Sequence, residues 1–143
     1  MTRQELFTWV RQQYGTEPEY PWNDWNAVLR HKNNNKWYAV VLEVGRDKLG
    51  LSHPGEVDVL NVKCDPILIG SYRTQAGFFP AYHMNKENWL SILLDKPKLD
   101  DSIKKLVALS YTLTAPKNRT RKTDAEETET NKRTKKAGSS AKG

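Results

Sequence analysis

Residues 82–89, with the sequence YHMNKENW, place several side chains that can do chemistry within a short stretch. His83 could act as a general base, Lys86 could hold a negative charge, and Cys64 could be a nucleophile if the fold brought it close. However, the three histidines lie far apart, and no paired-histidine, phosphate-loop or nucleophile-elbow motif occurs. One cysteine and scattered histidines also cannot supply a local set of metal ligands. We therefore expect a protein that is not an enzyme and that needs no metal or cofactor.

A binding surface is a second interpretation of the same residues. Lys63 stands beside Asp65, and His83 and Lys86 stand near Trp89, so positive charges and flat rings occur together. Lysines contact phosphates as point charges, and aromatic rings stack on exposed bases. Asp65 would repel a phosphate placed close to Lys63, which weakens that part of the interpretation. The pattern is typical of a surface for a phosphate backbone or an unpaired base.

A purely structural interpretation of these residues also stays open. Asp65 and Pro66 are explained as the start of a helix, because aspartate caps free amides and proline needs no amide partner at the first position. Asn85 and Asn88 suit a turn. In this interpretation three apolar residues pack under the last helix and two lysines are solvated: Tyr82, Met84 and Trp89, and Lys63 and Lys86.

The 143-residue chain is about one domain long, and its positive charge is concentrated near the C-terminal end. Residues 1–115 hold 14 Lys and Arg against 13 Asp and Glu, whereas residues 116–143 hold 9 against 4. The net charge of +6 therefore says little about the part that folds. Cys64 has no partner for a disulfide, no apolar signal segment begins the chain, and the longest apolar run is residues 37–42. We expect a cytoplasmic protein with no membrane span.

The first helix has the clearest boundaries in the sequence. Thr2 and Glu5 match a capping box, in which the two side chains satisfy free backbone amides at the start of a helix. Apolar residues follow at helical spacing up to Tyr14, and Gly15 can end the helix. The sequence thus predicts a helix over residues 3–14, followed by an extended connection that contains prolines and tryptophans.

Five later segments have strand patterns and two more have helix patterns. The order α-β-β-β-α-β-β-α, with short links between strands, predicts a mainly antiparallel five-stranded sheet with the helices on one face. The fold class is therefore α+β, a two-layer α/β sandwich over residues 1–115. The predicted strands are residues 27–31, 36–44, 57–63, 78–82 and 89–94. The predicted helices are residues 66–74 and a last helix that ends at Pro116, with Ile103, Leu106, Val107, Ser110 and Leu113 at helical spacing.

Residues 116–143 contain no aromatic and no large aliphatic residue. Such a segment cannot bury enough apolar surface to offset its ordering entropy, so we expect a disordered basic tail. Two basic clusters in it can hold nucleic acid without sequence preference, although a solubilising extension also fits. The clusters are Lys117, Arg119, Arg121 and Lys122, and Lys132, Arg133, Lys135 and Lys136.

Four segments stand out once the elements are placed: residues 61–66 (NVKCDP), residues 82–86 (YHMNK) with Trp89, residues 110–111 (SY), and residues 20–22 (YPW). They resemble the MmcQ/YjbR family of bacterial proteins, and the resemblance spans residues 1–115. It implies a small α+β fold similar to the type III secretion chaperones, often described as CyaY-like. It also implies a DNA-binding role.

The first functional hypothesis is a monomeric, non-enzymatic DNA-binding protein that contacts the phosphate backbone without strong sequence specificity. Lys63, Arg73 and Lys86 would contact phosphates together with the basic tail, and His83 and Trp89 would support them. Base-specific readout is not expected, because no helix has the pattern of a recognition helix.

The second hypothesis is a protein-interaction adaptor or chaperone-like module with no role in nucleic-acid binding. It would use the face of the sheet or the connection that carries Trp22 and Trp25, since partly exposed aromatic pairs are common at interfaces.

Overall fold

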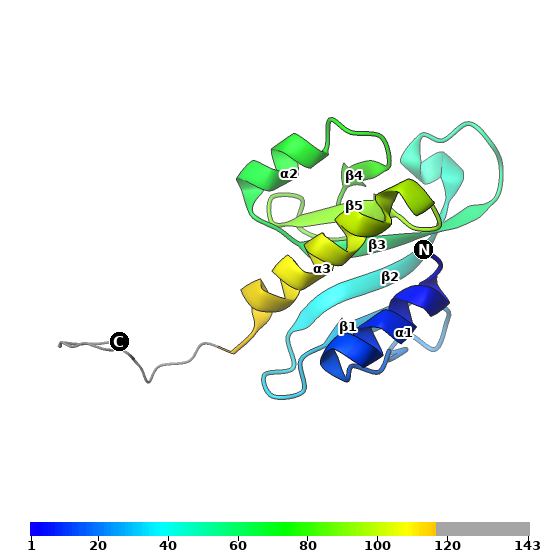
Figure 1. The fold of residues 1–143 in the computed structure, drawn as a ribbon. Helices are drawn as coiled ribbons and strands as arrows, with labels where there is room; N and C mark the ends of the chain where they lie inside the picture. The colour runs from blue at the N-terminus through cyan, green and yellow to red at the C-terminus, as the bar shows by residue number, and fades with distance from the viewer. Residues whose placement is uncertain (117–143) are drawn as a thin grey trace.

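The computed structural model describes residues 1–116, which form one antiparallel sheet with three α-helices on one side (Figure 1). The strand order is β1-β2-β3-β5-β4, and every neighbouring pair is antiparallel. The predicted α+β class and element order are therefore confirmed. The elements are α1 (Arg3–Tyr14), β1 (Ala27–Arg30), β2 (Trp37–Gly45), β3 (Glu56–Lys63), α2 (Pro66–Tyr72), β4 (Phe78–Pro80), β5 (Trp89–Leu93) and α3 (Asp100–Thr114), with short 3₁₀ turns η1 (Arg46–Leu49) and η2 (Pro97–Leu99).

Helix α1 begins and ends where its local sequence requires. The Thr2 side chain accepts a hydrogen bond from the Glu5 amide, and the Glu5 carboxylate accepts one from the Thr2 amide, so the capping box forms. Gly15 closes the helix at φ 66°, a left-handed conformation that a residue without Cβ adopts at little cost. Because these signals are local, the predicted bounds of residues 3–14 agree with the structure.

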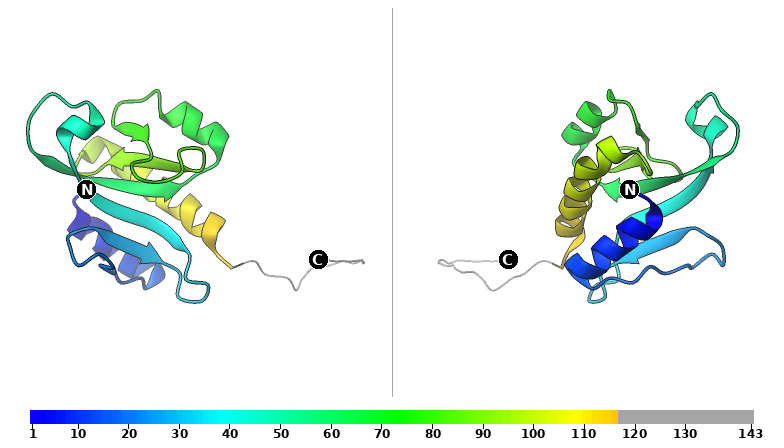
Figure 2. Two further views of the ribbon diagram at one scale, coloured as in Figure 1. Left: turned by 180° about the vertical axis from the view of Figure 1, so that it is seen from behind. Right: turned by 45° about the vertical axis from the view of Figure 1, so that its right-hand side comes forward.

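Two apolar clusters lie on opposite faces of the sheet. On the helix-covered face, side chains such as Leu60 and Ile92 pack against Ile103 and Leu106 of α3. Each fully buried side chain of this size contributes about 1.5–3 kcal/mol relative to an exposed one. On the other face, which we call the open face, Val40 and its neighbours form a smaller cluster that loops cover, and Figure 2 (left) shows this face in front of the helices. The open face is therefore the side of the sheet that carries no helix.

A β-bulge at Tyr38 decides which rings reach the open face. Leu29 pairs with Ala39 and Arg30 pairs with Trp37, so Tyr38 is an extra residue in β2. The Tyr38 ring lies in the helix-covered core, while Trp37 is exposed. The hydroxyl group of Ser110 on α3 donates to the Tyr38 carbonyl at 2.6 Å and accepts from the Lys63 amide at 2.9 Å, so a buried side chain satisfies backbone groups of two strands.

The structure corrects two details of packing predicted from the sequence. Helical spacing places Leu113 in the buried stripe of the last helix, but its side chain is 53% exposed, and Thr114 is buried instead, one helical turn after Ser110. Tyr82 and Met84 do not pack under that helix as the structural interpretation expects, since both pack on the open face. The reason is topological, because the connection from β4 to β5 runs over the face that carries no helix.

The edges of the sheet are short or covered. Strand β4 has three residues and ends at Pro80, which has no amide to donate. At the opposite edge, Glu19 forms an isolated antiparallel bridge with Val28 of β1, with backbone hydrogen bonds of 3.0 and 2.8 Å. The connection between α1 and β1 thus lies along an edge strand that would otherwise be bare.

His31 joins the β1–β2 hairpin to the end of α3. Its Nε2 lies 3.0 Å from the Tyr111 carbonyl and 3.0 Å from the Thr114 hydroxyl, which itself donates to the Ser110 carbonyl. The ring therefore carries its proton on Nε2. The side chain is 5% exposed, and this burial lowers its pKa below the ordinary value of 6.5. The folded protein consequently favours the neutral imidazole.

We expect the stability of the protein to fall as the pH drops below about 6.5, the unfolded-state pKa of His31. In that range the unfolded chain binds a proton that the folded chain resists, so His31 contributes its full stability only above that value. Thermal unfolding at a series of pH values should show a smaller acid-side loss in His31→Gln than in the natural chain. His53 is exposed, so His53→Gln should keep the natural slope. Parallel curves for the natural chain and His31→Gln would contradict this prediction.

Candidate functional site

The loop of residues 81–88 is fixed to the open face by a buried polar network. The Asn61 side-chain amide donates to the Tyr82 carbonyl at 2.9 Å, and the Tyr82 amide donates to the Ser91 hydroxyl at 2.9 Å. The Ser91 hydroxyl in turn donates to Asn61 Oδ1, and both side chains are fully buried. Asn61, which begins the segment of residues 61–66, therefore fixes the segment of residues 82–86 in place through hydrogen bonds.

A groove of about 400 Å³ opens between this loop and the connection that precedes β1. The rings of Trp22 and Trp37 meet in it edge to face, with 5.7 Å between centroids and 88° between planes. Both rings are well exposed, Trp22 at 47%, as expected for that connection. The groove is lined by Trp22, Asp24, Asn26, Trp37, Val40, Leu42, His83 and Met84.

The polar rim of the groove is held by local hydrogen bonds. Asp24 Oδ1 accepts from the Asn26 amide at 2.9 Å, and its Oδ2 accepts from Asn26 Nδ2 at 3.3 Å. Asn26 Oδ1 accepts from the Glu43 amide at 2.9 Å, which ties the turn to β2. The Asp24 carboxylate is thus oriented, yet each oxygen has a further lone pair for a ligand.

His83 reaches the groove in an uncommon backbone conformation. Its φ is 60°, in the left-handed region that costs a residue with a side chain about 1–3 kcal/mol. The imidazole is exposed and lies 4.1 Å from the Tyr82 ring, and within residues 1–116 it makes no hydrogen bond. A backbone outlier of this kind at the rim of a groove is typical of a functional position.

Three residues on neighbouring strands form a row beside the groove, which we call the Trp–Lys–Trp row: Trp37, Lys63 and Trp89. Lys63 and Trp89 are direct partners across β3 and β5. Both adjoin residues of the helix-covered core, so strand alternation directs them to the open face. Trp37 lies near the same end of the sheet and lines the groove. In the strand order β2-β3-β5, Lys63 thus lies on the strand between those of Trp37 and Trp89. A lysine near two aromatic residues suits a ligand that has both phosphates and flat bases.

Arg3 anchors the connection that forms one wall of the groove. Its guanidinium binds both carboxylate oxygens of Asp58, at 3.0 and 2.7 Å, and also donates to the Trp25 carbonyl. The guanidinium carbon lies 4.3 Å from the centroid of the Trp25 ring. Because the Arg3 side chain is 2% exposed, these bonds connect α1, β3 and the wall of the groove inside the protein.

The other residues predicted for the site lie apart from the groove. Lys86 is exposed in the same loop but lines a separate hollow with Lys48 and Phe79. Arg73 follows α2, whose Ile69 packs in the helix-covered core, so it belongs to the helix layer. The predicted tail residues lie outside the described residues: Lys117, Arg119, Arg121, Lys122, Lys132, Arg133, Lys135 and Lys136.

Cys64 and His83 are not brought together as a catalytic pair would require. Cys64 is buried in the helix-covered cluster, where burial raises the pKa of its thiol and disfavours the thiolate. His83 lies on the open face. Asp65 caps α2 through the Ile67 amide at 2.8 Å, as the structural interpretation expected. No cluster of three or more metal-ligating side chains occurs in residues 1–116.

Three members of the site do not follow from the sequence motifs: Asp24, Asn26 and Trp37. Asp24 and Asn26 carry a weak signal, since an aspartate two residues before an asparagine favours an Asx turn. Trp37 carries none, because the bulge at Tyr38 reverses the face that simple alternation assigns to it.

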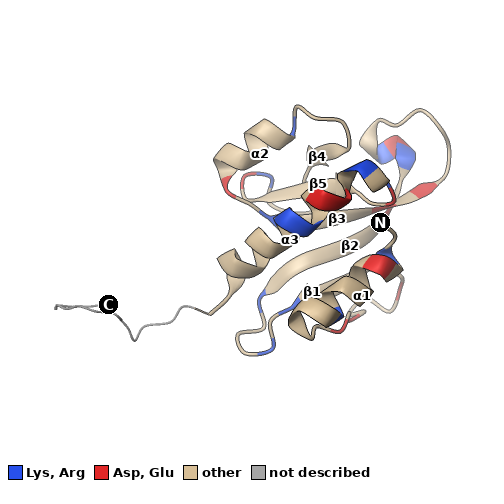
Figure 3. Cartoon of the chain, in the orientation of Figure 1, with Lys and Arg blue, Asp and Glu red and all other residues tan. Residues whose placement is uncertain are grey.

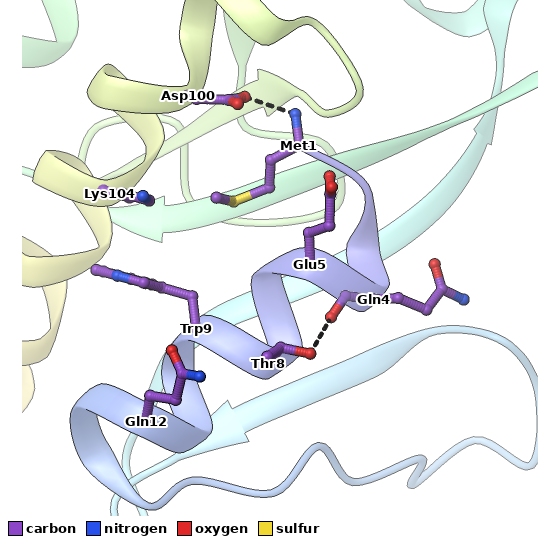
Figure 4. Close-up of a pocket in the computed structure, with 8 residues that line it drawn as sticks. All are labelled: Met1, Gln4, Glu5, Thr8, Trp9, Gln12, Asp100 and Lys104. Carbon is purple, nitrogen blue, oxygen red and sulfur yellow. Dashed lines mark hydrogen bonds and ion pairs between the residues drawn. The ribbon is translucent and has the colours of Figure 1, made fainter.

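A second hollow, of about 450 Å³, lies between α1 and the start of α3 (Figure 4). Two of its charges pair with each other, because the Met1 amine lies 2.5 Å from the Asp100 carboxylate. Trp9 and Lys104 also point toward it (Figure 4). None of the motif residues lines it. Positive and negative residues are interspersed over the ribbon, as Figure 3 shows, so charge alone does not mark a binding face among the described residues.

No helix in residues 1–116 is long and apolar enough to cross a lipid bilayer.

Comparisons with known proteins agree with the motifs. The family model described as YjbR matches residues 11–113. An uncharacterized protein of Bacillus subtilis, YyaQ, is 41% identical over 116 residues, which are 80% of this chain and 98% of that protein. A crystal structure of a Pseudomonas syringae protein is similar with a TM-score of 0.77 and 39% identity, covering 80% of this chain and all of that one. A Deinococcus radiodurans protein at 22% identity and TM-score 0.60, covering 78% of this chain and 77% of that one, shares the fold.

Proposed function

Since the chain belongs to the YjbR family, we propose that it is a non-enzymatic protein that binds single-stranded DNA on its open face. The observation that carries this proposal is the Trp–Lys–Trp row, in which Lys63 stands directly opposite Trp89. Trp37 is exposed, and Trp89 and Lys63 are half-buried. Bases stack on accessible rings irrespective of their sequence, and a lysine beside the rings neutralises a phosphate of the same strand. An antiparallel sheet with helices on one face and rings on the other is a common platform for single strands.

A single strand fits this face better than a duplex does. Stacking requires bare base faces, which a duplex hides. A duplex reader would also need a helix or ribbon directed at a groove and many cations along it. Helix α3 is covered with core contacts on one side and begins with Asp100 and Asp101, and residues 1–115 carry 14 basic against 13 acidic residues. We therefore expect weak binding to duplex DNA and moderate binding to single strands.

We expect Trp89→Ala to lower the affinity of the full chain for a single strand of about ten nucleotides by roughly tenfold, because a base stacked on a ring is worth about 1–3 kcal/mol. Lys63→Ala should weaken binding less but reduce the salt dependence by about one phosphate contact. Fluorescence anisotropy across a salt series measures both. Trp89→Phe keeps a ring and should restore most of the affinity, and Lys98→Ala, an exposed lysine of η2, is the matched control.

The same assay must distinguish DNA binding by the basic tail from DNA binding by the open face. A full-length variant in which the eight predicted basic tail residues are replaced by serine should still bind single strands with the Trp89 dependence. If that dependence disappears together with the tail charges, the tail alone binds and the proposal for the open face is rejected. If neither the natural chain nor any variant binds a strand at low salt, the DNA-binding proposal is rejected.

A protein-interaction module is the second candidate function. It is favoured by one observation, the exposure of Trp22 in the lining of a largely apolar groove. In that case strands would not bind, and a partner captured by the natural chain would be lost by Trp22→Ala.

A further inference from the structure

The groove beside the Trp–Lys–Trp row differs from the row in its chemistry. Its lining contains no lysine or arginine and one carboxylate, that of Asp24. A phosphate would therefore meet repulsion there and no charged partner. The wall is apolar and aromatic, with the perpendicular rings of Trp22 and Trp37 and the side chain of Met84. Such a lining suits a flat, uncharged group that has hydrogen-bond donors at its edge.

We propose that this groove binds one unstacked guanine base of a DNA strand that lies on the Trp–Lys–Trp row. The inference rests on the proposed function and names the part of the ligand that the groove takes. It is supported by continuity, because Trp37 belongs both to the row and to the lining of the groove. A base that unstacks from its neighbours in the strand at Trp37 would enter the groove. The DNA backbone would meanwhile stay in contact with Lys63.

The rim of the groove complements the Watson–Crick edge of guanine. That edge presents two adjacent N–H donors and one carbonyl acceptor. Asp24 offers carboxylate lone pairs in an orientation set by its bonds to Asn26. His83 offers a ring N–H that has no partner within residues 1–116, and its backbone conformation brings it to the rim. Carboxylates accept two parallel N–H bonds well, so Asp24 would read the donor pair while His83 binds the carbonyl.

Other bases satisfy this rim less completely. Thymine has one ring N–H, and adenine offers a single donor group on its Watson–Crick edge. Hypoxanthine keeps the ring N–H and the carbonyl of guanine but lacks its exocyclic amine. A site built to accept two donors discriminates against ligands that leave one acceptor unpaired. The expected order of affinity is therefore guanine, then hypoxanthine, then thymine.

The test uses the full chain and labelled strands of about ten thymidines with one central position varied to guanine or hypoxanthine. Anisotropy should give guanine an advantage of at least about fivefold over thymine, with hypoxanthine between them. Asp24→Asn should abolish the guanine advantage, because an amide presents a donor where the base also has one. Asp47→Asn removes the same charge from the exposed turn η1, away from the groove, and should keep the advantage.

The outcomes separate this inference from the proposed function. Equal affinity for guanine and thymine strands, or a guanine advantage that survives in Asp24→Asn, overturns the inference while strand binding on the row stands. If no strand binds, the proposed function fails, and free guanosine then tests the groove by itself. Shifts of the indole N–H signals of Trp22 and Trp37 in NMR spectra on addition of guanosine would support the groove, and unchanged signals would overturn the inference.

Discussion

Replacing Arg3 with alanine should lower the free energy of unfolding by about 3 kcal/mol, the largest single effect that we expect in this protein. The guanidinium is 2% exposed and binds both oxygens of Asp58, whose side chain is 24% exposed. Removing it leaves that carboxylate without its partner in a part-buried place, and it also leaves the Trp25 carbonyl without its donor. This expected loss lies at the lower end of the range for breaking a buried ion pair, because the Asp58 carboxylate is partly exposed to solvent.

Chemical denaturation of Arg3→Ala and of the natural chain measures this effect. The matched control is Arg11→Ala, which removes an exposed ion pair with Glu17 on the same helix and should change stability by less than about 1 kcal/mol. Arg3→Ala should also reduce the guanine preference, because the wall that carries Trp22 and Asp24 loses its anchor at Trp25. A loss below about 1 kcal/mol would show that the Arg3 contacts are not the main link between α1 and the sheet.

Replacing Asn61 with alanine should cost about 2–3 kcal/mol and should loosen the loop that carries His83. The side chain is fully buried in mid-sheet and joins the Tyr82 carbonyl to the Ser91 hydroxyl. Without it, these two polar groups are left inside the protein with unmet hydrogen-bonding capacity. The motif that begins at Asn61 would thus act on the binding site through the position of the loop.

Two measurements on Asn61→Ala separate a local effect from a general one. Denaturation gives the loss of stability, with the exposed Asn33→Ala as a control that should stay within about 0.5 kcal/mol of the natural chain. Hydrogen exchange should show faster exchange at the Tyr82 amide, which Ser91 now holds, than in the natural chain. Unchanged exchange in this loop would mean that other contacts hold it in place.

The elements were predictable from the sequence where their signals are local. The capping box at Thr2 and the αL glycine at Gly15 set the bounds of α1, and Asp65 with Pro66 set the start of α2. The alternating and apolar runs predicted five strands close to their observed bounds. These signals depend on residues that are close together in the sequence, so they can be interpreted without the tertiary structure.

The candidate site was only partly predictable, because its residues come from distant segments. Of the residues that the sequence pointed to, Lys63, His83 and Trp89 lie on the open face. Lys86 lines a separate hollow, and Arg73 lies in the helix layer. The motifs did not reveal that Trp22 and Trp37 meet, since that contact depends on the bulge in β2 and on the bonds that hold the preceding connection.

The side on which an apolar residue packs was also hidden from the sequence. Met84 has the same character whether it lies under α3 or under the loops of the open face, so periodicity cannot choose between them. In the same way, a small shift in the phase of α3 exchanges Leu113 for Thr114 at the buried position.

The covered borders of the sheet have a consequence for how copies of the protein behave when concentrated. Strand-to-strand joining between molecules needs a long, unpaired row of amides and carbonyls, and in residues 1–116 the border at β4 stops at Pro80 while the border at β1 is occupied by the bridge from Glu19. Crowding should therefore not join molecules strand to strand through these two borders. Weakening the Glu19 bridge would leave β1 as an unpaired edge strand that can pair with another molecule, and fibrous aggregates would be the first visible sign.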